Sequence, residues 1–370
     1  MSGSQTHHRH ATGHPGFTYN PYEISFCGQA GSSRSTLVSR LARFVFTDHV
    51  VGHVNDDVPY QGASTEKSMT YCERTHSQHV VVYPPRKDGY IHPWALIDTD
   101  MVLVEEGHDS DLPKIVVLDD MRKGRFSNVI AYVGRGESCA GQATGAPFFQ
   151  RDNLEEIRNF ILGYFAERVR AMPLYGLVLA GGHSTRMNAD KAALQYHGRP
   201  QVRHACELLD PLCERVFVSS RTGQAEEPAL RGLPQIHDTF IDMGPMGGIL
   251  SAMRAHPQAA WLVLAVDLPL MDGQTLDELI RRRNPFKLAT AFVGNHGSLP
   301  EPLCAIYEPK SIFRLMHFLA QGLTCPRKVL INSGTQLVEP SNREALHNAN
   351  GPGDYDEAVA LLKAQGRIAP

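Results

Sequence analysis

A glycine-rich turn followed by two cations occupies residues 179–194, "LAGGHSTRMNADKAAL". It follows the apolar run "YGLVLA", which predicts a strand that delivers Gly181 and Gly182 to its carboxyl end. Glycines at such a turn leave backbone N–H groups open to an anion, because no Cβ blocks its approach. Arg186 and Lys191 follow at a spacing that suits cations on either side of a polyphosphate. These residue types predict phosphate binding; the alternative is a tight strand-to-helix turn with two solvated cations.

A carboxylate at the end of another predicted strand is a candidate metal ligand. The stretch "WLVLAVDLP" is apolar from Trp261 to Val266 and then presents Asp267 beside a proline that ends the strand. Mg²⁺ accepts one or two protein oxygens and leaves its other positions to water and phosphate. Asp267 is therefore predicted to hold Mg²⁺, and the alternative role is a helix N-cap or a turn residue.

Two α/β patterns must position these side chains. The first begins at "YEISFCGQAGSSRSTLVSRLARFV", with a strand around residues 24–27 and a helix on which Leu37, Leu41 and Phe44 recur at helical spacing. The second begins at "LYGLVLAGG". Between them, a helix that ends before Pro173 is predicted from an apolar stripe made of Leu154, Ile157, Ile161, Leu162 and Phe165.

Length and composition predict a two-domain globular protein. A chain of 370 residues is longer than one core usually grows, and 42% hydrophobic with 20% charged residues is ordinary for a folded protein. We predict an α/β fold with a disordered His-rich tail at 1–20, an N-terminal domain at 21–170 and a C-terminal domain at 171–370. The tail's histidines lack neighbouring Cys or carboxylate ligands, which favours a solvated segment over a metal site.

Charge and cysteine usage exclude several classes of function. The formal net charge of -3 argues against a protein that coats nucleic acid or an anionic membrane. Seven cysteines without a C-x-x-C pair favour reduced thiols over a zinc site or a disulfide frame. No apolar run reaches the length of a membrane span, and no signal-peptide core is present near residue 1, so a cytoplasmic location is expected.

The glycine-rich stretch resembles the signature L-A-G-G-x-S-x-R-M-G-x-D-K-x-x-L of the molybdenum cofactor guanylyltransferases, within the larger nucleotidyltransferase superfamily. The stretches "GPMGGILSAM", "VLAVDLPLM" and "HNANGPGDYDEA" resemble that family's G-P-x-x-G, D-x-P and N-x-N-x-P-x-D segments, in the same order. The resemblance covers residues 174–358 and implies a Rossmann-like nucleotidyltransferase domain. The nucleotide contacts that it implies are Leu179, Ala180, Gly181, Gly182, Ser184, Lys191, Asp238, Gly244, Gly248 and Asp267.

Further roles are implied by the same resemblance. Asn350 is the second oxygen ligand of Mg²⁺, with a simple turn residue as the alternative. Asp238 lies near the guanine nucleotide, and the neighbouring Asp242 is the alternative for that role. The chain departs from the family at "VFVSSR", where Ser219 and the residues after it replace an expected asparagine, and at "LPEPLCAIY", where Glu301 replaces an amide.

The resemblance implies a complete reaction. The terminal phosphate of molybdopterin attacks the α-phosphorus of GTP in line, which releases pyrophosphate and leaves the guanine dinucleotide cofactor. Asp267 holds Mg²⁺, Lys191 lies near the reacting centre, and Arg186 steadies the leaving pyrophosphate. The expected partners are the small molecules GTP and molybdopterin, with transient contacts to molybdoenzymes and cofactor-insertion proteins. The alternatives are cytidylyl or sugar-phosphate transfer and a non-catalytic cofactor carrier.

The N-terminal half contains a degenerate phosphate loop. "GQAGSSRSTL" follows the outline G-x-x-x-x-G-K-[ST], except that serine replaces the second glycine and arginine replaces the lysine. With the predicted strands in "VGHVNDD", "TDMVLVEEGH" and "LPKIVVLDD", of which the second ends at Glu105 and Glu106, it resembles the small P-loop GTP-binding adaptor of the same pathway. The other interpretation is a scaffold or dimer module. The candidate phosphate-loop residues are Gly28, Gly31, Ser33, Arg34, Ser35 and Thr36.

Overall fold

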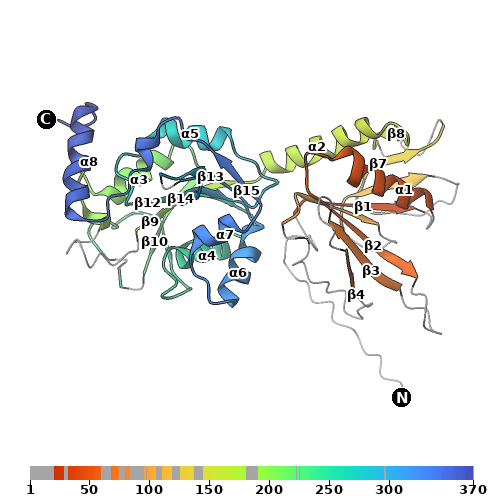
Figure 1. Ribbon diagram of the computed structural model, residues 1–370, viewed down its shortest axis with the longest axis horizontal. Coiled ribbons are helices and arrows are strands. Elements are labelled where there is room, and N and C mark those ends of the chain that lie inside the picture. Colours follow the sequence, from red (N-terminus) through yellow and green to blue (C-terminus); the bar gives the residue numbers. More distant parts are fainter. Residues whose placement is uncertain are drawn as a thin grey trace, which may run out of the picture.

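The computed structural model shows two lobes, each built on its own β-sheet, with α2 (Leu154–Arg170) extending from the first lobe toward the second (Figure 1). It describes residues 21–28, 32–59, 68–74, 80–83, 96, 98–105, 111–118, 126–136, 145–180, 191–221, 223–224, 226–295 and 297–369. The predicted tail at residues 1–20 lies outside the described residues.

The first sheet has the strand order β4-β3-β2-β5-β1-β6-β7-β8 within the described residues. Neighbouring strands run parallel from β2 to β8, whereas β3 and β4 are antiparallel. The strands predicted in the first half are confirmed, because they correspond to β1, β2, β5 and β6. The bounds are β1 Glu23–Gly28, β2 Val51–Pro59, β3 Ser68–Arg74, β4 Val80–Tyr83, β5 Met101–Glu105, β6 Lys114–Leu118, β7 Val129–Gly134 and β8 Phe148–Gln150.

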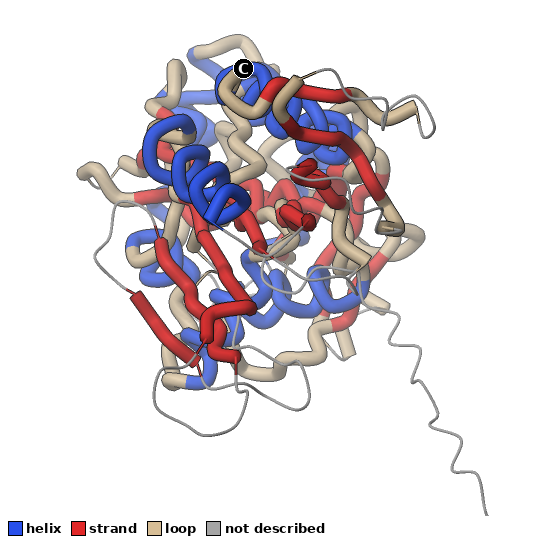
Figure 2. The backbone as a smooth tube through the Cα atoms, turned by 90° about the vertical axis from the view of Figure 1, so that its right-hand side faces the viewer, coloured by secondary structure: helices blue, strands red, loops and turns tan. Residues whose placement is uncertain are grey.

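Helices pack against this sheet, as Figure 2 shows from the side of the first lobe. The predicted helix after β1 is α1 (Ser32–Arg40), and it continues as a π-helical turn, Leu41–Val45. Leu37 and Leu41 are buried, whereas Phe44, which follows them at helical spacing, is 74% exposed. The π-helical turn has more residues per turn than an α-helix, so Phe44 turns away from the core and the residues that follow it face inward.

The helix α2 follows the predicted stripe closely. Its N-cap is Asn153, whose side chain accepts a hydrogen bond from the backbone N–H of Glu156, and its last turn carries two arginines that suit the negative end of the helix dipole. Ile157, Ile161 and Phe165 are fully buried, and Leu154 and Leu162 are partly buried around them. The helix ends at Arg170, before Pro173, as predicted.

The second sheet has the order β11-β10-β9-β12-β14-β13-β15 within the described residues. Its strand pairs are parallel except for the two that involve β14. The mixed α/β fold predicted from the sequence is therefore present in this half. The bounds are β9 Leu174–Leu179, β10 Arg215–Ser220, β11 Gln235–His237, β12 Ala260–Ala265, β13 Ala289–Val293, β14 Pro300–Tyr307 and β15 Thr335–Val338.

Helices cover both faces of the second sheet, so its central strands are apolar on both sides. In β12, Leu262 and Leu264 pack in the core that contains α3 and α5, whereas Trp261 and Val263 pack in the core that contains α4, α6 and α7. This alternation follows from the two-residue repeat of a strand. The bounds are α3 Gln201–Leu209, α4 Pro245–Ala255, α5 Gly273–Arg281, α6 Ser311–Ala320, α7 Pro326–Ile331 and α8 Pro352–Ala364.

Polar and aromatic contacts join the two lobes. The rings of Tyr22 and Phe286 pack with their centroids 4.9 Å apart. Lys310 is buried in this interface, and its burial lowers its pKa to about 8. Basic side chains of the second lobe contact the segment that leads into β5: Lys287 with Asp100 at 2.8 Å, Lys310 with the Thr99 carbonyl at 2.9 Å, and Arg314 with Asp98 at 3.4 Å.

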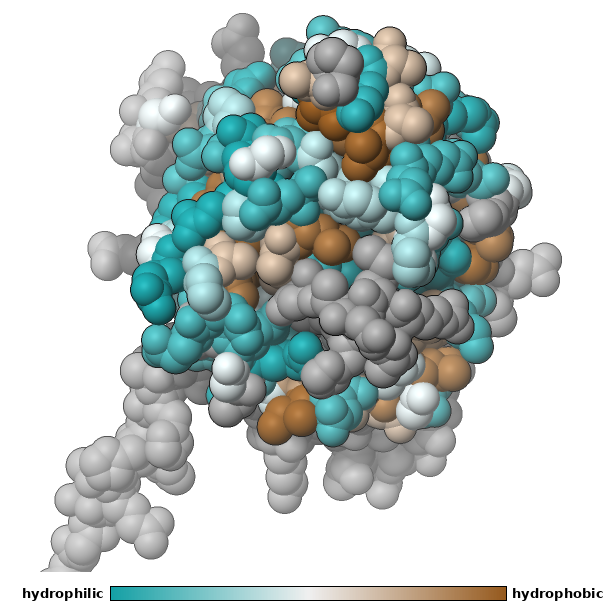
Figure 3. Space-filling view, turned by 90° about the vertical axis from the view of Figure 1, so that its left-hand side faces the viewer, coloured by the Kyte–Doolittle hydropathy of each residue, from teal (hydrophilic) through white to brown (hydrophobic). Residues whose placement is uncertain are grey.

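The surface of the second lobe is largely hydrophilic on the side that faces away from the first lobe, with its apolar residues in small separate patches (Figure 3). Among the described residues, no helix combines the length and the apolar character that a membrane span requires.

Candidate active site

One edge of the second sheet collects the candidate residues of the C-terminal half. Leu179 at the end of β9 pairs with Ser219 of β10 and Ala265 of β12, so these strands end together. The strand β14 runs the opposite way and begins at the same edge, because its first residue, Pro300, pairs with Val293 at the end of β13. Ligands of open α/β sheets bind at this carboxyl edge.

Lys191 joins two segments of the chain at this edge. It opens a short 3₁₀ turn after β9, and its Nζ donates hydrogen bonds to Asn350 Oδ1 at 2.8 Å and to the Ala349 carbonyl at 3.2 Å. The same ammonium lies 4.0 Å from Asp267 Oδ2. The Ala349 N–H in turn donates to the Asp267 carbonyl at 2.8 Å. The structure thus brings together three residues that were predicted from separate motifs, Lys191, Asp267 and Asn350.

The oxygens of this cluster fit a hard cation. Asp267 Oδ1 is buried and has no hydrogen-bond partner among the described residues. Burial raises the pKa of the Asp267 carboxyl, and the Lys191 charge partly offsets that rise. In the described part of the chain, no group of three or more His, Cys, Asp and Glu side chains forms a metal site. Carboxylate and amide oxygens such as those of Asp267 and Asn350 are ligand types that Mg²⁺ accepts beside water and phosphate.

Most of the glycine-rich turn falls outside the described residues. Gly181, Gly182, Ser184 and Arg186 belong to that part, so their predicted phosphate contacts remain predictions. The two residues before them, Leu179 and Ala180, are 8% and 1% exposed, and both pack in the core of the lobe. Their side chains therefore hold the end of β9 in place, which leaves the backbone to face the edge.

Asp238 lies at the same edge, directly after β11. Its Oδ1 accepts a hydrogen bond of 2.7 Å from Ser219 Oγ, and burial raises the pKa of its carboxyl. A Cβ on Gly248 would lie 2.4 Å from Ser219 Oγ, so glycine at this position allows α4 to approach β10. Gly244, with φ 56°, turns the chain into α4. Asp242 also has a positive φ, 60°, which is uncommon for a residue other than glycine.

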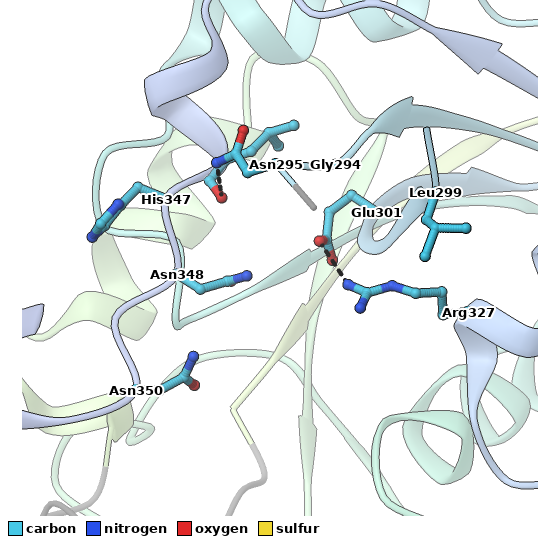
Figure 4. A pocket seen from close by; sticks show the side chains of 9 residues that line it. Gly294, Asn295, Leu299, Glu301, Arg327, His347, Asn348 and Asn350 are labelled. Carbon is cyan, nitrogen blue, oxygen red and sulfur yellow. Dashed lines mark hydrogen bonds and ion pairs between the residues drawn. The ribbon is translucent and has the colours of Figure 1, made fainter. Parts of the chain in front are cut away.

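A cavity of about 210 Å³ lies beside Asn350 at the start of β14 (Figure 4). Within it, Arg327 Nη2 lies 3.1 Å from Glu301 Oε2, and Arg327 Nε donates to the Pro300 carbonyl at 3.2 Å. Burial raises the pKa of Glu301, and the charge of Asp267 adds to that rise. The cavity is lined by Gly294, Asn295, Leu299, Glu301, Arg327, Leu346, His347, Asn348 and Asn350.

Of these lining residues, the sequence analysis singled out only Glu301 and Asn350. Arg327 is the second residue of α7, a short helix that carries no recognised motif, so its approach to Glu301 could not be predicted. Asn295 and Asn348 lie in loops, which have no helical or strand periodicity from which the orientation of a side chain could be predicted. A signal did exist for Asn348, because it is the first asparagine of "NANGPGD", the stretch that also supplies Asn350.

In the first lobe, Glu105 at the end of β5 is the centre of a buried polar cluster. Its Oε2 accepts a hydrogen bond from Ser35 Oγ at 2.5 Å and lies 3.5 Å from Arg34 Nε, while its Oε1 lies 2.6 Å from His53 Nε2. Burial favours the neutral acid, but the hydrogen bonds from His53 and Ser35 outweigh it and hold the pKa of Glu105 below its usual value. Arg34 is 3% exposed and also donates to the Gly28 carbonyl at 3.3 Å.

The remaining candidates of this loop are arranged around that cluster. Gly28 has φ 142°, and a Cβ there would lie 2.5 Å from the Val117 carbonyl oxygen, so only glycine fits. The Ser33 carbonyl accepts a hydrogen bond from Arg151 at 3.1 Å, and Thr36 is on the exposed side of α1. Gly31 and Glu106 lie outside the described residues.

Comparisons with known proteins find similarity in the C-terminal half of the chain. Residues 176–336 match the family model described as "MobA-like NTP transferase domain". The chain is 37% identical over 189 residues to the "Molybdenum cofactor biosynthesis bifunctional protein" of Synechocystis sp., a match that covers 51% of this chain and 54% of that protein. It is 31% identical over 196 residues to the "Molybdenum cofactor guanylyltransferase" of Cereibacter sphaeroides, covering 52% of this chain and 98% of that protein.

Among solved structures, the chain is similar to molybdopterin-guanine dinucleotide biosynthesis protein A from Archaeoglobus fulgidus. The TM-score is 0.45 at 22% sequence identity, and the match covers 51% of this chain and 99% of that one.

Proposed function

This chain belongs to the molybdenum cofactor guanylyltransferases, a family of nucleotidyltransferase enzymes, and we propose that it transfers GMP from GTP to the terminal phosphate of molybdopterin. An oxygen of the acceptor phosphate forms a bond to the α-phosphorus of GTP. The bond from that phosphorus to the β-phosphate oxygen breaks, and pyrophosphate leaves with the electron pair. The transfer needs no oxidant and no covalent enzyme intermediate, so catalysis consists of positioning and charge neutralisation.

The observation that carries this proposal is the convergence of Lys191, Asp267 and Asn350. Two of the three N–H donors of the Lys191 ammonium are used by the Asn350 side chain and the Ala349 carbonyl, which fix its position. Within the described residues these are its two hydrogen bonds, and the third donor is proposed to bind a phosphate oxygen. An ammonium fixed in this way meets developing charge without reorganisation, which is the efficient arrangement for transition-state stabilisation.

Mg²⁺ would be held by the carboxylate of Asp267 and the amide oxygen of Asn350. When bound, it would neutralise phosphate oxygens of the nucleotide. The chain prepares this site by keeping Asp267 Oδ1 buried and unpaired, and by fixing the Asp267 main chain through the Ala349 N–H. Gly181, Gly182, Ser184 and Arg186 are proposed to contact the phosphates, with Arg186 on the leaving pyrophosphate.

The guanine base is proposed to bind beside Asp238. One of its carboxylate oxygens is occupied by Ser219, which leaves the other for the N–H groups on the Watson–Crick edge of guanine. Cytosine has a single amino donor on its Watson–Crick edge, so it would donate fewer hydrogen bonds to the Asp238 carboxylate. Gly244 and Gly248 support this side of the site by shaping the turn into α4 and its packing on Ser219.

The cavity beside Asn350 is proposed to receive the acceptor. It adjoins the metal ligands, and Arg327 supplies a cation that Glu301 and the Pro300 carbonyl hold in a fixed orientation. A guanidinium fixed by a carboxylate is well suited to a phosphate or another anionic group. Acceptor and nucleotide would then approach the Lys191 ammonium from opposite sides.

The nucleotide that the enzyme uses can be tested directly. We expect the purified full chain, with molybdopterin and Mg²⁺, to release pyrophosphate and form the dinucleotide with GTP at least ~10²-fold faster than with CTP, because a carboxylate left unpaired by the wrong base is costly. Coupled pyrophosphate detection and chromatography of the product provide the two measurements.

Three other outcomes of this assay would contradict the proposal. A preference for CTP would identify a cytidylyltransferase, and transfer to a sugar phosphate in place of molybdopterin would identify a different acceptor class. Binding of molybdopterin without pyrophosphate release from any nucleotide would identify a carrier.

For the first lobe, we propose a structural role rather than GTP hydrolysis, although the sequence of its loop resembles the P-loop of a GTP-binding adaptor. The supporting observation is that Arg34, which replaces the phosphate-binding lysine, is directed toward Glu105 and the Gly28 carbonyl. A guanidinium in this position is neutralised by a buried carboxylate. It would have to leave that carboxylate before it could bind a phosphate, which leaves a buried charge uncompensated.

GTP stoichiometry tests this role. We expect the full chain to bind a single GTP, and the double variant Ser33→Gly, Arg34→Lys to bind the same amount, as measured by calorimetric titration with Mg²⁺. The full chain is required, because Lys287 and Lys310 of the second lobe contact the first. Two GTP molecules bound per wild-type chain would support the adaptor instead, and a second GTP gained only by the variant would show a phosphate cradle that Arg34 obstructs.

A further inference from the structure

The segment at residues 267–271, which carries Asp267, is fixed by hydrogen bonds to its main-chain carbonyls. Every main-chain carbonyl of the segment accepts a hydrogen bond, although the segment belongs to no helix or strand. The donors are the Ala349 N–H to Asp267 (2.8 Å), the Met271 N–H to Leu268 (3.2 Å), His197 Nε2 to Pro269 (3.0 Å), Arg367 Nη1 to Leu270 (2.6 Å) and Arg367 Nη2 to Met271 (2.6 Å).

Arg367 is the only side chain in this set that holds two carbonyls. Its planar guanidinium presents parallel N–H donors, which match two consecutive carbonyl oxygens and fix their relative orientation. Both hydrogen bonds are charge-assisted and short, so they are stronger than neutral ones. A lysine at this position would present a single ammonium and could not fix both carbonyls in the same way.

The end of α8 explains why Arg367 points back toward this segment. Gly366 has φ 67°, and its N–H donates to the Lys363 carbonyl, while the Arg367 N–H donates to the Leu362 carbonyl. This pair of hydrogen bonds is the Schellman ending of a helix, which reverses the chain direction through a left-handed glycine. The stretch "KAQGR" therefore turns Arg367 back along α8.

The residues that precede α8 are also attached to the segment at residues 267–271, through the Ala349 N–H. Asp354 in the first turn of α8 accepts hydrogen bonds from the N–H groups of Asn350 (2.7 Å) and Gly351 (2.9 Å). This cap fixes Asn350 beside Lys191 and keeps the Ala349 N–H on the Asp267 carbonyl. Between the two ends, Leu362 of α8 packs in the same buried cluster as Leu270.

From these contacts we infer that Arg367 is a positioning residue for the reaction: it fixes the main chain that follows Asp267 and so sets the direction of the metal-binding carboxylate. This inference rests on the proposed role of Asp267. Residues that orient a metal ligand without touching the metal typically change metal affinity or activity by about 10- to 100-fold when they are replaced. The helix α8 thus connects two attachment points, namely Ala349 and Asn350, which precede it, and Arg367, which follows it.

Arg367→Ala in the full chain tests the inference. We expect kcat to fall ~10-fold with the KM for GTP within about twofold of wild type, because the change misdirects a group that acts in the transition state. We also expect weaker binding of Mn²⁺ in the presence of GTP, measured by electron paramagnetic resonance, and faster hydrogen exchange at the Ala349 and Met271 amides. Arg367→Lys should give an intermediate result in all three measurements. Arg343→Ala, which removes an arginine that is 57% exposed and pairs with Glu339, is the matched control.

A lower melting temperature in Arg367→Ala with unchanged exchange, Mn²⁺ affinity and kcat would overturn the inference, because it would show a purely structural role. Should Arg367→Ala fail to fold, Arg367→Lys decides the matter by the same measurements. In the Asp267→Asn background, Arg367→Ala should have no further effect on turnover, and an undiminished effect would place its action elsewhere. If the wild type forms no dinucleotide, the proposed function fails, whereas hydrogen exchange and Mn²⁺ binding still report on Arg367.

Discussion

Asp267→Asn is expected to lower turnover by about 10²-fold or more while the chain remains folded. The amide is nearly isosteric with the carboxylate, and the main-chain carbonyl of residue 267 keeps its hydrogen bond from Ala349. What the variant loses is the negative charge on an oxygen that is buried and unpaired. That charge would attract Mg²⁺ to this edge, so its loss would weaken binding of the metal beside the reacting phosphates.

The expected effect of Asp267→Asn on stability is opposite to its effect on turnover. Burial raises the pKa of Asp267 above its unfolded value, so ionisation of this carboxyl costs stability as the pH rises through the folded pKa. The asparagine variant has no such ionisation and therefore none of its cost. We expect the melting temperature of Asp267→Asn at pH 7 to equal or exceed that of wild type.

Asp277→Asn is the matched control, because that aspartate lies on α5 and is 48% exposed in an ion pair with Arg281. It should leave turnover and melting temperature close to wild type. Near-normal turnover in Asp267→Asn would remove Asp267 from the site. A large fall in its melting temperature would instead show that the carboxylate stabilises the fold.

Lys191→Ala is expected to lower kcat by roughly 10- to 10²-fold, with a smaller change in GTP affinity. The negative charge on the phosphate oxygens near Lys191 grows during transfer, so the ammonium binds the transition state more tightly than it binds GTP. The loss of its contact with Asn350 adds to the effect, although the Asn350 main chain stays fixed by Asp354. Steady-state kinetics, combined with calorimetric measurement of GTP affinity, separates the two quantities.

The control for this variant is Lys363→Ala, which removes an exposed lysine from the last turn of α8. It should leave both kcat and GTP affinity unchanged within about twofold. An effect of Lys191→Ala confined to KM would assign Lys191 to ground-state binding rather than to stabilisation of the transition state.

Local sequence patterns were sufficient to find the strands and the catalytic edge. An apolar run that ends in a carboxylate places Asp267 at the end of β12, and the short strand before Asp238 places that residue at the end of β11. Ligands of open α/β sheets bind outside the carboxyl ends of the strands, which is where both residues lie. Phe44, which shares the helical spacing of Leu37 and Leu41, is exposed because a π-helical turn changes the period that the pattern assumes.

Side-chain partners were decided by tertiary structure. Nothing near Arg34 in the sequence indicates that it contacts Glu105 rather than a phosphate, and nothing near Arg327 indicates its approach to Glu301. Long polar side chains have many rotamers of similar energy, so the positions of buried carboxylates and carbonyls select among them, and these positions exist only in the folded chain.

The family, the α/β elements and the residues proposed to carry the chemistry could be predicted from local periodicity and from motifs in their order along the chain. The folded chain adds contacts that the motifs could not predict: Lys191 contacts Asn350, Arg367 holds the segment after Asp267, and Lys287 and Lys310 join the two lobes. These contacts join residues far apart in the chain. Their geometry follows from the packing of helices and strands on a shared core, which local periodicity does not specify.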